Sequence, residues 1–356
     1  MDHIVSVKNR LSKAISIMRF PLIVMIVMLH CYSSVPFLSG SHTFFHKALY
    51  PFGLWMGETG VPAFFFISGY LFFISSKTYV QKIKTRFSTL MIPYLLWNGL
   101  ILLGYVVLFM LGHPQQIADK NIADYGFTDY LLAFIHRGVW DNGNGVPLLC
   151  PYWYVRNLIV LCLLSPVVYY LVKWTKGIVL FFFFFWWLSQ YHNAMIASSV
   201  FFFSLGSYFA IDNNTPTVYI FRNRVLFLSL WGVIALTDIL SHSVISVSGA
   251  FYIHRLSLLL NVCGFLLVTD LLFTKSRFLN NKMLANSAFW IFTIHYPIVL
   301  ALRKACVVLG VNCSDGVHIL LFFICVILTV LICIVLYHLA IKVVPTFVRI
   351  SMGNRV

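Results

Sequence analysis

The sequence predicts an all-α integral membrane protein of about ten transmembrane helices, with both termini in the cytoplasm. Of its 356 residues, 60% are hydrophobic and only 10% are charged, whereas a soluble domain carries about a quarter charged residues. Mean hydropathy is +0.89. Apolar runs of about 20 residues recur along nearly the whole chain, and each is long enough to cross a hydrocarbon core of about 30 Å.

The predicted spans are residues 14–33, 52–75, 90–112, 155–173, 177–190, 194–211, 224–242, 250–273, 284–303 and 317–343. The first apolar run follows a basic leader and continues directly into further spans, so we expect a first helix rather than a cleavable signal. The fifth span is short and its ends are the least defined.

Lys and Arg residues are distributed unequally between alternate loops. Seventeen of the 25 fall in the two terminal segments and in every second loop, whereas five, Lys47, Lys120, Arg137, Arg303 and Lys304, fall in the other loops. Cytoplasmic loops of membrane proteins carry this excess of positive charge, so it predicts cytoplasmic termini. The same distribution accounts for the net charge of +15 and excludes a nucleic-acid-binding protein.

Residues 113–152 form the one long predicted connection, and the topology places it outside the cytoplasm. It contains Asp119, Asp124, Asp129, Asp141 and the turn-rich run DNGNG. This segment is either a lid or acceptor-binding element or a solvated linker. We expect the whole chain, 1–356, to form one transmembrane domain.

The eight cysteines are scattered and lie mostly inside apolar segments. None has a CxxC spacing, so no metal or redox site is predicted. Cys306 and Cys313 could meet in an outer loop, but two buried thiols are the favoured interpretation.

Arg19 and His30 are the clearest ionisable pair inside a predicted span. They are eleven residues apart, close to three helical turns, so they share one helix face and lie about 16 Å apart along its axis. Ionisable side chains in a membrane normally face a partner or a polar cavity. Arg19 would lie toward the cytoplasm and His30 in the outer half. Alternatively, Arg19 extends to the interface and His30 hydrogen-bonds a neighbouring helix.

Glu58 is the only glutamate of the chain and lies at the start of the second span. Its depth is close to that of His30, so it could orient the imidazole or pair with an arginine. It could also be an acid favoured by a helix N-terminus. The small residues Ser68 and Gly69 further along this span would let another helix approach closely.

Several later residues extend the set of candidates in the predicted outer half. An interfacial aromatic belt explains Tyr152 and Trp153, but Arg156 lies just inside the span. The others are His254, Arg255 and His295. Their similar depth predicts an outward-facing polar chamber.

A basic run precedes the third span on the cytoplasmic side. Lys82, Lys84 and Arg86 could hold the phosphates of a nucleotide-like donor, or only fix the topology.

Taken in order, these segments resemble the acyltransferase-3 family of membrane O-acyltransferases. The matching features are R-x10-H from Arg19 to His30, GVPAFFFISGYLFF, the basic run before IPYLLW, PYWYVRNLIVLCLLSPVV, FFFSLGSYFA and FWIFTIHYPIV. They extend from residue 19 to about residue 299 in family order. One departure is that the family often has R-x-x-R before the third-helix proline, where this chain has its basic residues earlier.

The resemblance implies transfer of an acyl group, usually acetyl, from cytoplasmic acyl-CoA to a hydroxyl of a cell-surface carbohydrate, with no tightly bound cofactor. It places the chain as a multi-pass protein of a bacterial inner or plasma membrane, in contact with lipid. His30 matches the family's essential histidine and Arg19 its paired arginine, with Glu58 as a third catalytic candidate. Donor contacts would be Arg19, Lys82, Lys84 and Arg86, and acceptor or oxyanion contacts would be Tyr152, Trp153, Arg156, His254, Arg255 and His295.

Two other classes compete with this interpretation. A transporter or a flippase of a glycan or lipid-linked glycan would also line a path with polar residues, but it would need no acyl donor. A membrane sensor without catalysis is the third class. The sequence does not predict an oligomeric state.

Overall fold

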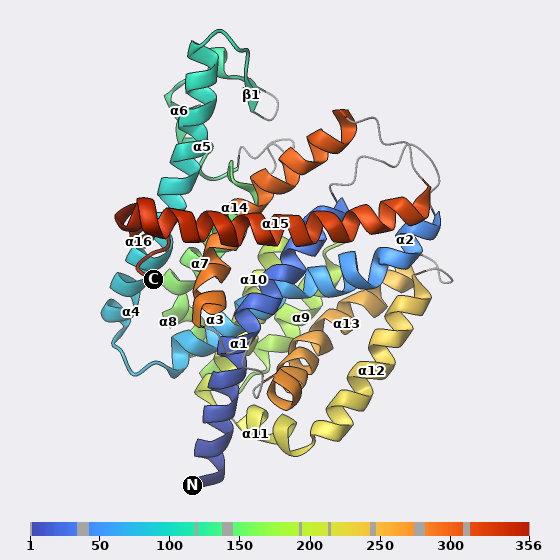
Figure 1. Ribbon diagram of the computed structural model, residues 1–356. Coiled ribbons are helices and arrows are strands. Elements are labelled where there is room, and N and C mark those ends of the chain that lie inside the picture. The colour runs from blue at the N-terminus through green and yellow to red at the C-terminus, as the bar shows by residue number, and fades with distance from the viewer. Residues whose placement is uncertain are drawn as a thin grey trace. The chain divides into compact units, whose positions relative to one another are not determined.

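The computed structural model describes residues 2–33, 43–117, 120–136, 145–191, 194–212, 215–242, 247–273, 282–308 and 314–355, and almost all of them are helical (Figure 1). The α-helices are α1 Asp2–Ser33, α2 Thr43–Tyr50, α3 Gly57–Ile74, α4 Tyr79–Arg86, α5 Ile92–Met110, α6 Phe127–Leu132, α7 Trp153–Leu163, α8 Ser165–Trp174, α9 Val179–Ser189, α10 Met195–Ile211, α11 Thr215–Arg222, α12 Arg224–Ser241, α13 Val247–Val268, α14 Lys282–Val308, α15 Asp315–Val343 and α16 Pro345–Ser351. Single π-helical turns join several of them at Pro51–Met56, Phe87–Met91 and Thr269–Phe273, and 3-10 turns lie at Ile122–Asp124 and Cys150–Tyr152. Two strands, β1 Gln116–Ile117 and β2 Lys120–Asn121, pair antiparallel.

Among the residues that the structure describes, seven helical stretches are long and apolar enough to cross a membrane, or eight if α7 and α8 together make one span. The seven are Arg10–Tyr32, His46–Ile74, Tyr79–Met110, Arg224–Ser241, Gly249–Leu272, Met283–Cys306 and Asp315–Val343. Each overlaps one of the ten predicted spans, so the predicted all-α membrane fold is confirmed. The count of ten crossings and the side of the termini stay predictions.

The other three predicted spans are helical but shorter than a simple crossing. Segment 155–173 is not one helix: it breaks at Leu164, and Ser165 and Pro166 start the next helix. A proline has no N–H to donate and is tolerated in the first turn of a helix, which accounts for the break. Helices α9 and α10 have 11 and 17 residues, below the roughly 20 that a perpendicular crossing needs.

The chain folds into two compact units, each built from separate stretches of sequence. Unit 1 contains Met1–Ser76 and Ser165–Val335, and unit 2 contains Lys77–Leu164 and Leu336–Val356.

In unit 1, α3 and α10 pack with their backbones in near contact. A Cβ atom on Gly69 would lie 2.1 Å from the carbonyl oxygen of Phe203, and one on Gly206 would lie 2.0 Å from that of Phe66. Only glycine fits at either position, because a backbone carbonyl cannot rotate away as a side chain can. The predicted close approach at Gly69 is therefore confirmed, and its partner helix is α10.

Helix α1 packs against both α3 and α14. On the α3 side, a Cβ atom on Gly57 would lie 2.8 Å from the Leu29 Cβ atom, and one on Gly60 would lie 2.7 Å from Ile26 Cγ1. These small residues place α3 directly against the C-terminal half of α1, as small residues do between membrane helices.

Helices α3, α12 and α13 are joined by a buried polar layer. The Asn261 side chain donates to Thr59 Oγ1 at 2.8 Å and accepts from Trp231 Nε1 at 2.8 Å. Trp55 Nε1 donates to Ser257 Oγ at 2.8 Å. Buried polar groups need partners of this kind, so the layer fixes how the three helices align.

In unit 2, the long connection 113–152 is folded wherever the structure describes it. Ile117, Ile122, Ala133 and Leu148 form a buried cluster with Leu102 of α5. The carboxylate of Asp129 accepts from the Gly126 backbone N–H at 2.9 Å and from Lys120 Nζ at 2.7 Å. The described parts are therefore a packed element rather than a solvated linker.

We expect Gly69→Ala to lower the free energy of unfolding by about 3 kcal/mol, the upper end of ordinary overpacking costs, because the added methyl group meets a carbonyl oxygen that cannot move alone. Gly232→Ala is the matched control, since no atom lies within 4 Å of a Cβ atom built there. Thermal unfolding of both variants in detergent measures the difference. Equal melting temperatures would show that α3 and α10 are not packed this closely.

Candidate active site

His30 lies in the last turn of α1, beside His295 and Tyr296 of α14. The ring centroid of His30 is 5.2 Å from that of His295 and 5.1 Å from that of Tyr296. Two histidines that are 265 positions apart in the sequence thus meet within unit 1. The sequence placed both at similar depth without showing that they are neighbours.

His295 is fully buried, and its two ring nitrogens have different environments. Nδ1 lies 2.9 Å from the carbonyl oxygen of Ile291, to which it donates. Nε2 is buried and has no hydrogen-bond partner among the described residues. With the proton on Nδ1, Nε2 carries a lone pair, an assignment that follows from the hydrogen bond. In this tautomer His295 can accept a proton or a hydrogen bond, but it cannot donate to an oxyanion.

Helix α1 continues without a break from Asp2 to Ser33, including Pro21, so Arg19 and His30 do share one helix with the expected spacing. The Arg19 side chain is exposed and that of His30 is partly buried. A polar route between them stays a prediction.

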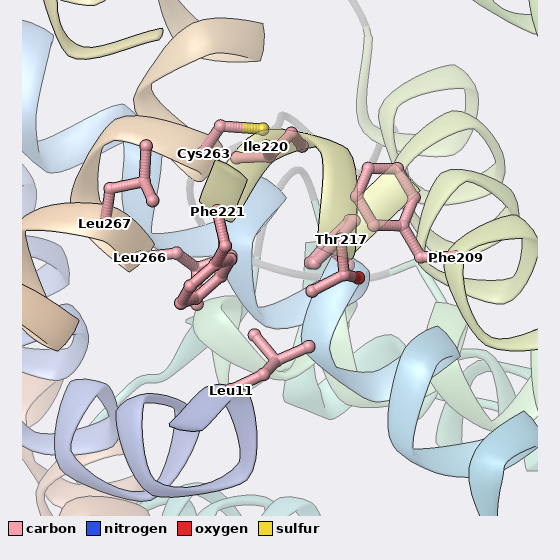
Figure 2. Close-up of a pocket in the computed structure, with 9 residues that line it drawn as sticks. Leu11, Phe209, Thr217, Ile220, Phe221, Cys263, Leu266 and Leu267 are labelled. Carbon is pink, nitrogen blue, oxygen red and sulfur yellow. The ribbon is translucent and has the colours of Figure 1, made fainter. Parts of the chain in front are cut away.

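A pocket in unit 1 is lined in part by Leu11, in the N-terminal half of α1 (Figure 2). The pocket is partly open, and its empty space of about 280 Å³ includes the space at its mouth. Its walls are Leu11, Phe66, Phe209, Thr217, Ile220, Phe221, Cys263, Leu266 and Leu267. The lining is apolar apart from the Thr217 hydroxyl and the Cys263 thiol, so this pocket suits a hydrocarbon group and not a phosphate.

A second polar cluster in unit 1 is built from α3, α12, α13 and the end of α2. His254 Nε2 lies 3.2 Å from Glu58 Oε2, and His254 Nδ1 lies 2.9 Å from Asp238 Oδ2. The Tyr50 hydroxyl donates to Asp238 Oδ1 at 2.8 Å. The structure therefore pairs Glu58 with His254, and its predicted role in orienting His30 stays a prediction.

Arg255, the next residue on α13, lies over two aromatic rings. Its guanidinium carbon is 5.0 Å from the centroid of Trp187 and 4.9 Å from that of Phe251. One terminal nitrogen donates to the Gln190 carbonyl at 3.3 Å, and Nε is buried with no partner in the described part of the chain. Aromatic faces attract such cations, so Arg255 has a defined place at the end of α9.

Sequence reasoning missed Asp238 and Tyr50. Asp238 is a carboxylate inside the predicted span 224–242, and the high cost of such a group in hydrocarbon was signal enough to single it out. Tyr50 gave no comparable signal, because tyrosine is common near membrane interfaces. Asp270 was missed as well, and its carboxylate is paired with Arg10 of α1.

In unit 2, the three basic residues predicted to contact the donor lie on the short helix α4. Lys84 is exposed, and Lys82 and Arg86 are half-buried. Thr78 and Gln81 cap the start of this helix reciprocally. Their role with a donor stays a prediction.

The other candidates in unit 2 lie around the start of α7. Tyr152 is fully buried and stacks on Tyr94 with ring centroids 5.9 Å apart. Arg156 donates to the carbonyls of Ile135 and Gly145 and to the side chain of Asn157. These contacts hold the connection 113–152 in place. Contact of Tyr152, Trp153 or Arg156 with an acceptor stays a prediction.

We expect Arg156→Gln to loosen the connection 113–152, because two hydrogen bonds from a charged group to the loop backbone are lost. Each such bond contributes about 1.5–3 kcal/mol, so limited proteolysis within the loop should accelerate by about tenfold or more. The exposed Arg349→Gln is the matched control and should be cleaved like the unaltered protein. An unchanged cleavage rate in folded Arg156→Gln would contradict the anchoring role.

A largely helical membrane protein in which a partly buried histidine packs beside a buried one, with a carboxylate–imidazole cluster, has the acid–base groups of a membrane-embedded enzyme. The chain belongs to the acyltransferase domain family (acyltransferase-3), whose family model matches residues 12–338. It is thus a membrane acyltransferase.

One curated relative is a succinoglycan biosynthesis protein, ExoH, of Rhizobium meliloti (strain 1021). The two are 23% identical over 272 residues, which cover 69% of this chain and 68% of the relative. No solved structure matches the chain.

Proposed function

We propose that this protein is an O-acyltransferase that moves an acetyl group from cytoplasmic acetyl-CoA to a hydroxyl of a cell-surface or exported polysaccharide. Membership of the acyltransferase family and the likeness to a succinoglycan biosynthesis protein support this proposal. The structural observation that carries it is the position of His30, whose ring centroid lies 5.2 Å from that of His295 on another helix.

In the proposed reaction, His30 acts on the acceptor hydroxyl. Its imidazole takes the hydroxyl proton as the oxygen attacks the thioester carbonyl, the new ester C–O bond forms, and the C–S bond breaks. The thiolate of CoA leaves and takes up a proton, while the His30 imidazolium releases the proton that it took from the hydroxyl, so protons balance overall. General-base catalysis of this kind contributes about 10²–10⁴-fold to a rate. In the alternative route His30 attacks the thioester itself, so that an acyl C–N bond forms as the C–S bond breaks. The acceptor oxygen then attacks this acyl-histidine, and the ester C–O bond forms as the C–N bond breaks.

His295 supports His30 in this proposal. Because its Nδ1–H is held by the Ile291 carbonyl, the ring keeps a fixed orientation and offers the lone pair on Nε2 to its surroundings. It can therefore accept a hydrogen bond from a group at the reacting centre and stay uncharged in its buried position.

Donor binding is assigned to basic residues on the predicted cytoplasmic side. Arg19 would bind donor phosphates, since guanidinium groups bind phosphate in a bidentate way. Lys82, Lys84 and Arg86 would contribute charge from α4. The expected location is the bacterial inner membrane.

Transport or flipping of a glycan is the competing function, and it needs neither a donor nor His30 as a base. Purified protein in lipid, given radiolabelled acetyl-CoA and surface polysaccharide stripped of esters by mild alkali, separates the two. Transfer of label to the polysaccharide supports the acyltransferase, whereas no hydrolysis, labelling or transfer favours transport. Comparison by NMR of polysaccharide from wild-type and deletion strains, in search of one missing acetyl signal, identifies the acceptor.

We expect His30→Ala to lower the rate of label transfer by about 10²–10⁴-fold, because the general base is lost. The exposed His113→Ala is the matched control and should transfer label at the rate of the unaltered protein. Size-exclusion chromatography and thermal unfolding check that both variants fold. A folded His30→Ala protein that still acetylates at the unaltered rate would remove His30 as the base.

A further inference from the structure

In the cluster of Glu58, His254 and Asp238, His254 uses both of its ring nitrogens in hydrogen bonds, whereas Glu58 uses only one of its two oxygens. Both nitrogens of His254 lie within hydrogen-bond distance of a carboxylate, Nδ1 of Asp238 and Nε2 of Glu58. An imidazole can donate to two carboxylates only when both nitrogens carry protons. With Glu58 and Asp238 both ionised, His254 is a cation between two anions, and no ring nitrogen is left for another molecule.

Asp238 is the buried anchor of this cluster. Its side chain is 1% exposed, and both of its oxygens are used, one by the Tyr50 hydroxyl at 2.8 Å and one by His254 at 2.9 Å. Tyr50 is itself held by stacking on His242, with ring centroids 3.8 Å apart. A buried carboxylate is tolerated only with such complete pairing.

Glu58 is the opposite end of the cluster, and its side chain is 39% exposed. Only Oε2 contacts His254, so Oε1 is available as an acceptor within the described part of the chain. An ionised oxygen in a membrane-spanning segment cannot face lipid without a large cost. Its exposed surface must therefore face water or a polar ligand.

Aromatic and cationic groups lie next to this cluster. Arg255 follows His254 on α13 and is held over Trp187 and Phe251. Tyr191 is 48% exposed and packs on Phe251 with ring centroids 4.8 Å apart. Exposed aromatic faces pack on the apolar faces of sugar rings, while carboxylates accept hydrogen bonds from hydroxyls.

We propose that the Glu58 carboxylate is the group that binds hydroxyls of the glycan acceptor, and that His254, Asp238 and Tyr50 are positioning residues that hold it. This inference rests on the proposed function, and it replaces direct acceptor contact by His254 with an indirect role. The charges of Glu58, Asp238, His254 and Arg255 sum to zero. An uncharged, hydroxyl-rich sugar unit is therefore the class of ligand that adds no unbalanced charge.

The test uses full-length protein in lipid nanodiscs, with acetyl-CoA as donor and de-esterified surface polysaccharide as acceptor. Two rates are measured: release of free CoA thiol without acceptor, and transfer of acetyl to polysaccharide as its concentration varies. We expect Glu58→Gln to raise the acceptor KM by about tenfold or more, since a charge-assisted hydrogen bond is weakened. Acceptor-independent thiol release should stay within about twofold of the unaltered protein. The exposed Asp212→Asn, at the end of α10, is the control and should change neither rate.

A double variant distinguishes positioning from a general loss of structure. If Asp238 acts through Glu58, the single variant Asp238→Asn should raise the acceptor KM. The double variant Asp238→Asn, Glu58→Gln should then have nearly the same KM as Glu58→Gln, whereas two independent effects would multiply their fold-changes in KM. Glu58→Asp keeps the charge and should have an acceptor KM between those of the unaltered protein and Glu58→Gln. This variant provides the test if Glu58→Gln does not fold. An unchanged acceptor KM in folded Glu58 variants, or an equal fall in both rates, would overturn the inference. Failure of the unaltered protein to use acetyl-CoA would instead overturn the proposed donor.

Discussion

The cost of an uncompensated charge in hydrocarbon governs this structure. Three carboxylates inside the candidate spans are matched by cationic side chains of other helices. Asp270 pairs with Arg10, and His254 lies between Glu58 and Asp238. These pairs fix the register of the helices, because a shift of one helix along another would leave a buried charge without its partner. The polar groups thus define the arrangement of unit 1 as well as its chemistry.

Close backbone packing lets those partners reach one another. Helix α3 meets α10 at Gly69 and α1 at Gly57 and Gly60, and in each case a larger residue would collide with its neighbour. Since α3 also carries Glu58 and Thr59, the same helix that is wedged between α1 and α10 presents its polar residues to α13. On α3, the glycines therefore set the distance to the neighbouring helices, and the polar residues determine which side of α3 faces α13.

Sequence alone predicted the helical spans well, because apolar composition and length suffice for that purpose, and it predicted the close approach at Gly69. It could not predict that His30 meets His295 or that Glu58 meets His254. Helical periodicity tells which residues share a face, but not which helix that face meets. The break at Leu164 was readable in principle from Pro166. Asp238 could also have been predicted, because an acidic side chain inside a span is costly and normally has a partner or a function. Tyr50 could be recognised only from its hydrogen bond to Asp238 in the structure.

The two polar centres of unit 1 differ in charge, and this difference suits different parts of one reaction. His295 is buried with one nitrogen on a backbone carbonyl, an environment for an uncharged imidazole, whereas His254 is held as a cation by two carboxylates. An uncharged imidazole can remove a proton. An imidazolium held between two carboxylates cannot, but it can hold a carboxylate in place as a hydrogen-bond acceptor. The turns that carry His30 and Glu58 are in contact. Gly57, which directly precedes Glu58, lies against Leu29, which directly precedes His30. The contact at Gly57 therefore fixes the turn that carries His30, the proposed base, against the turn that carries Glu58, the proposed acceptor-binding carboxylate.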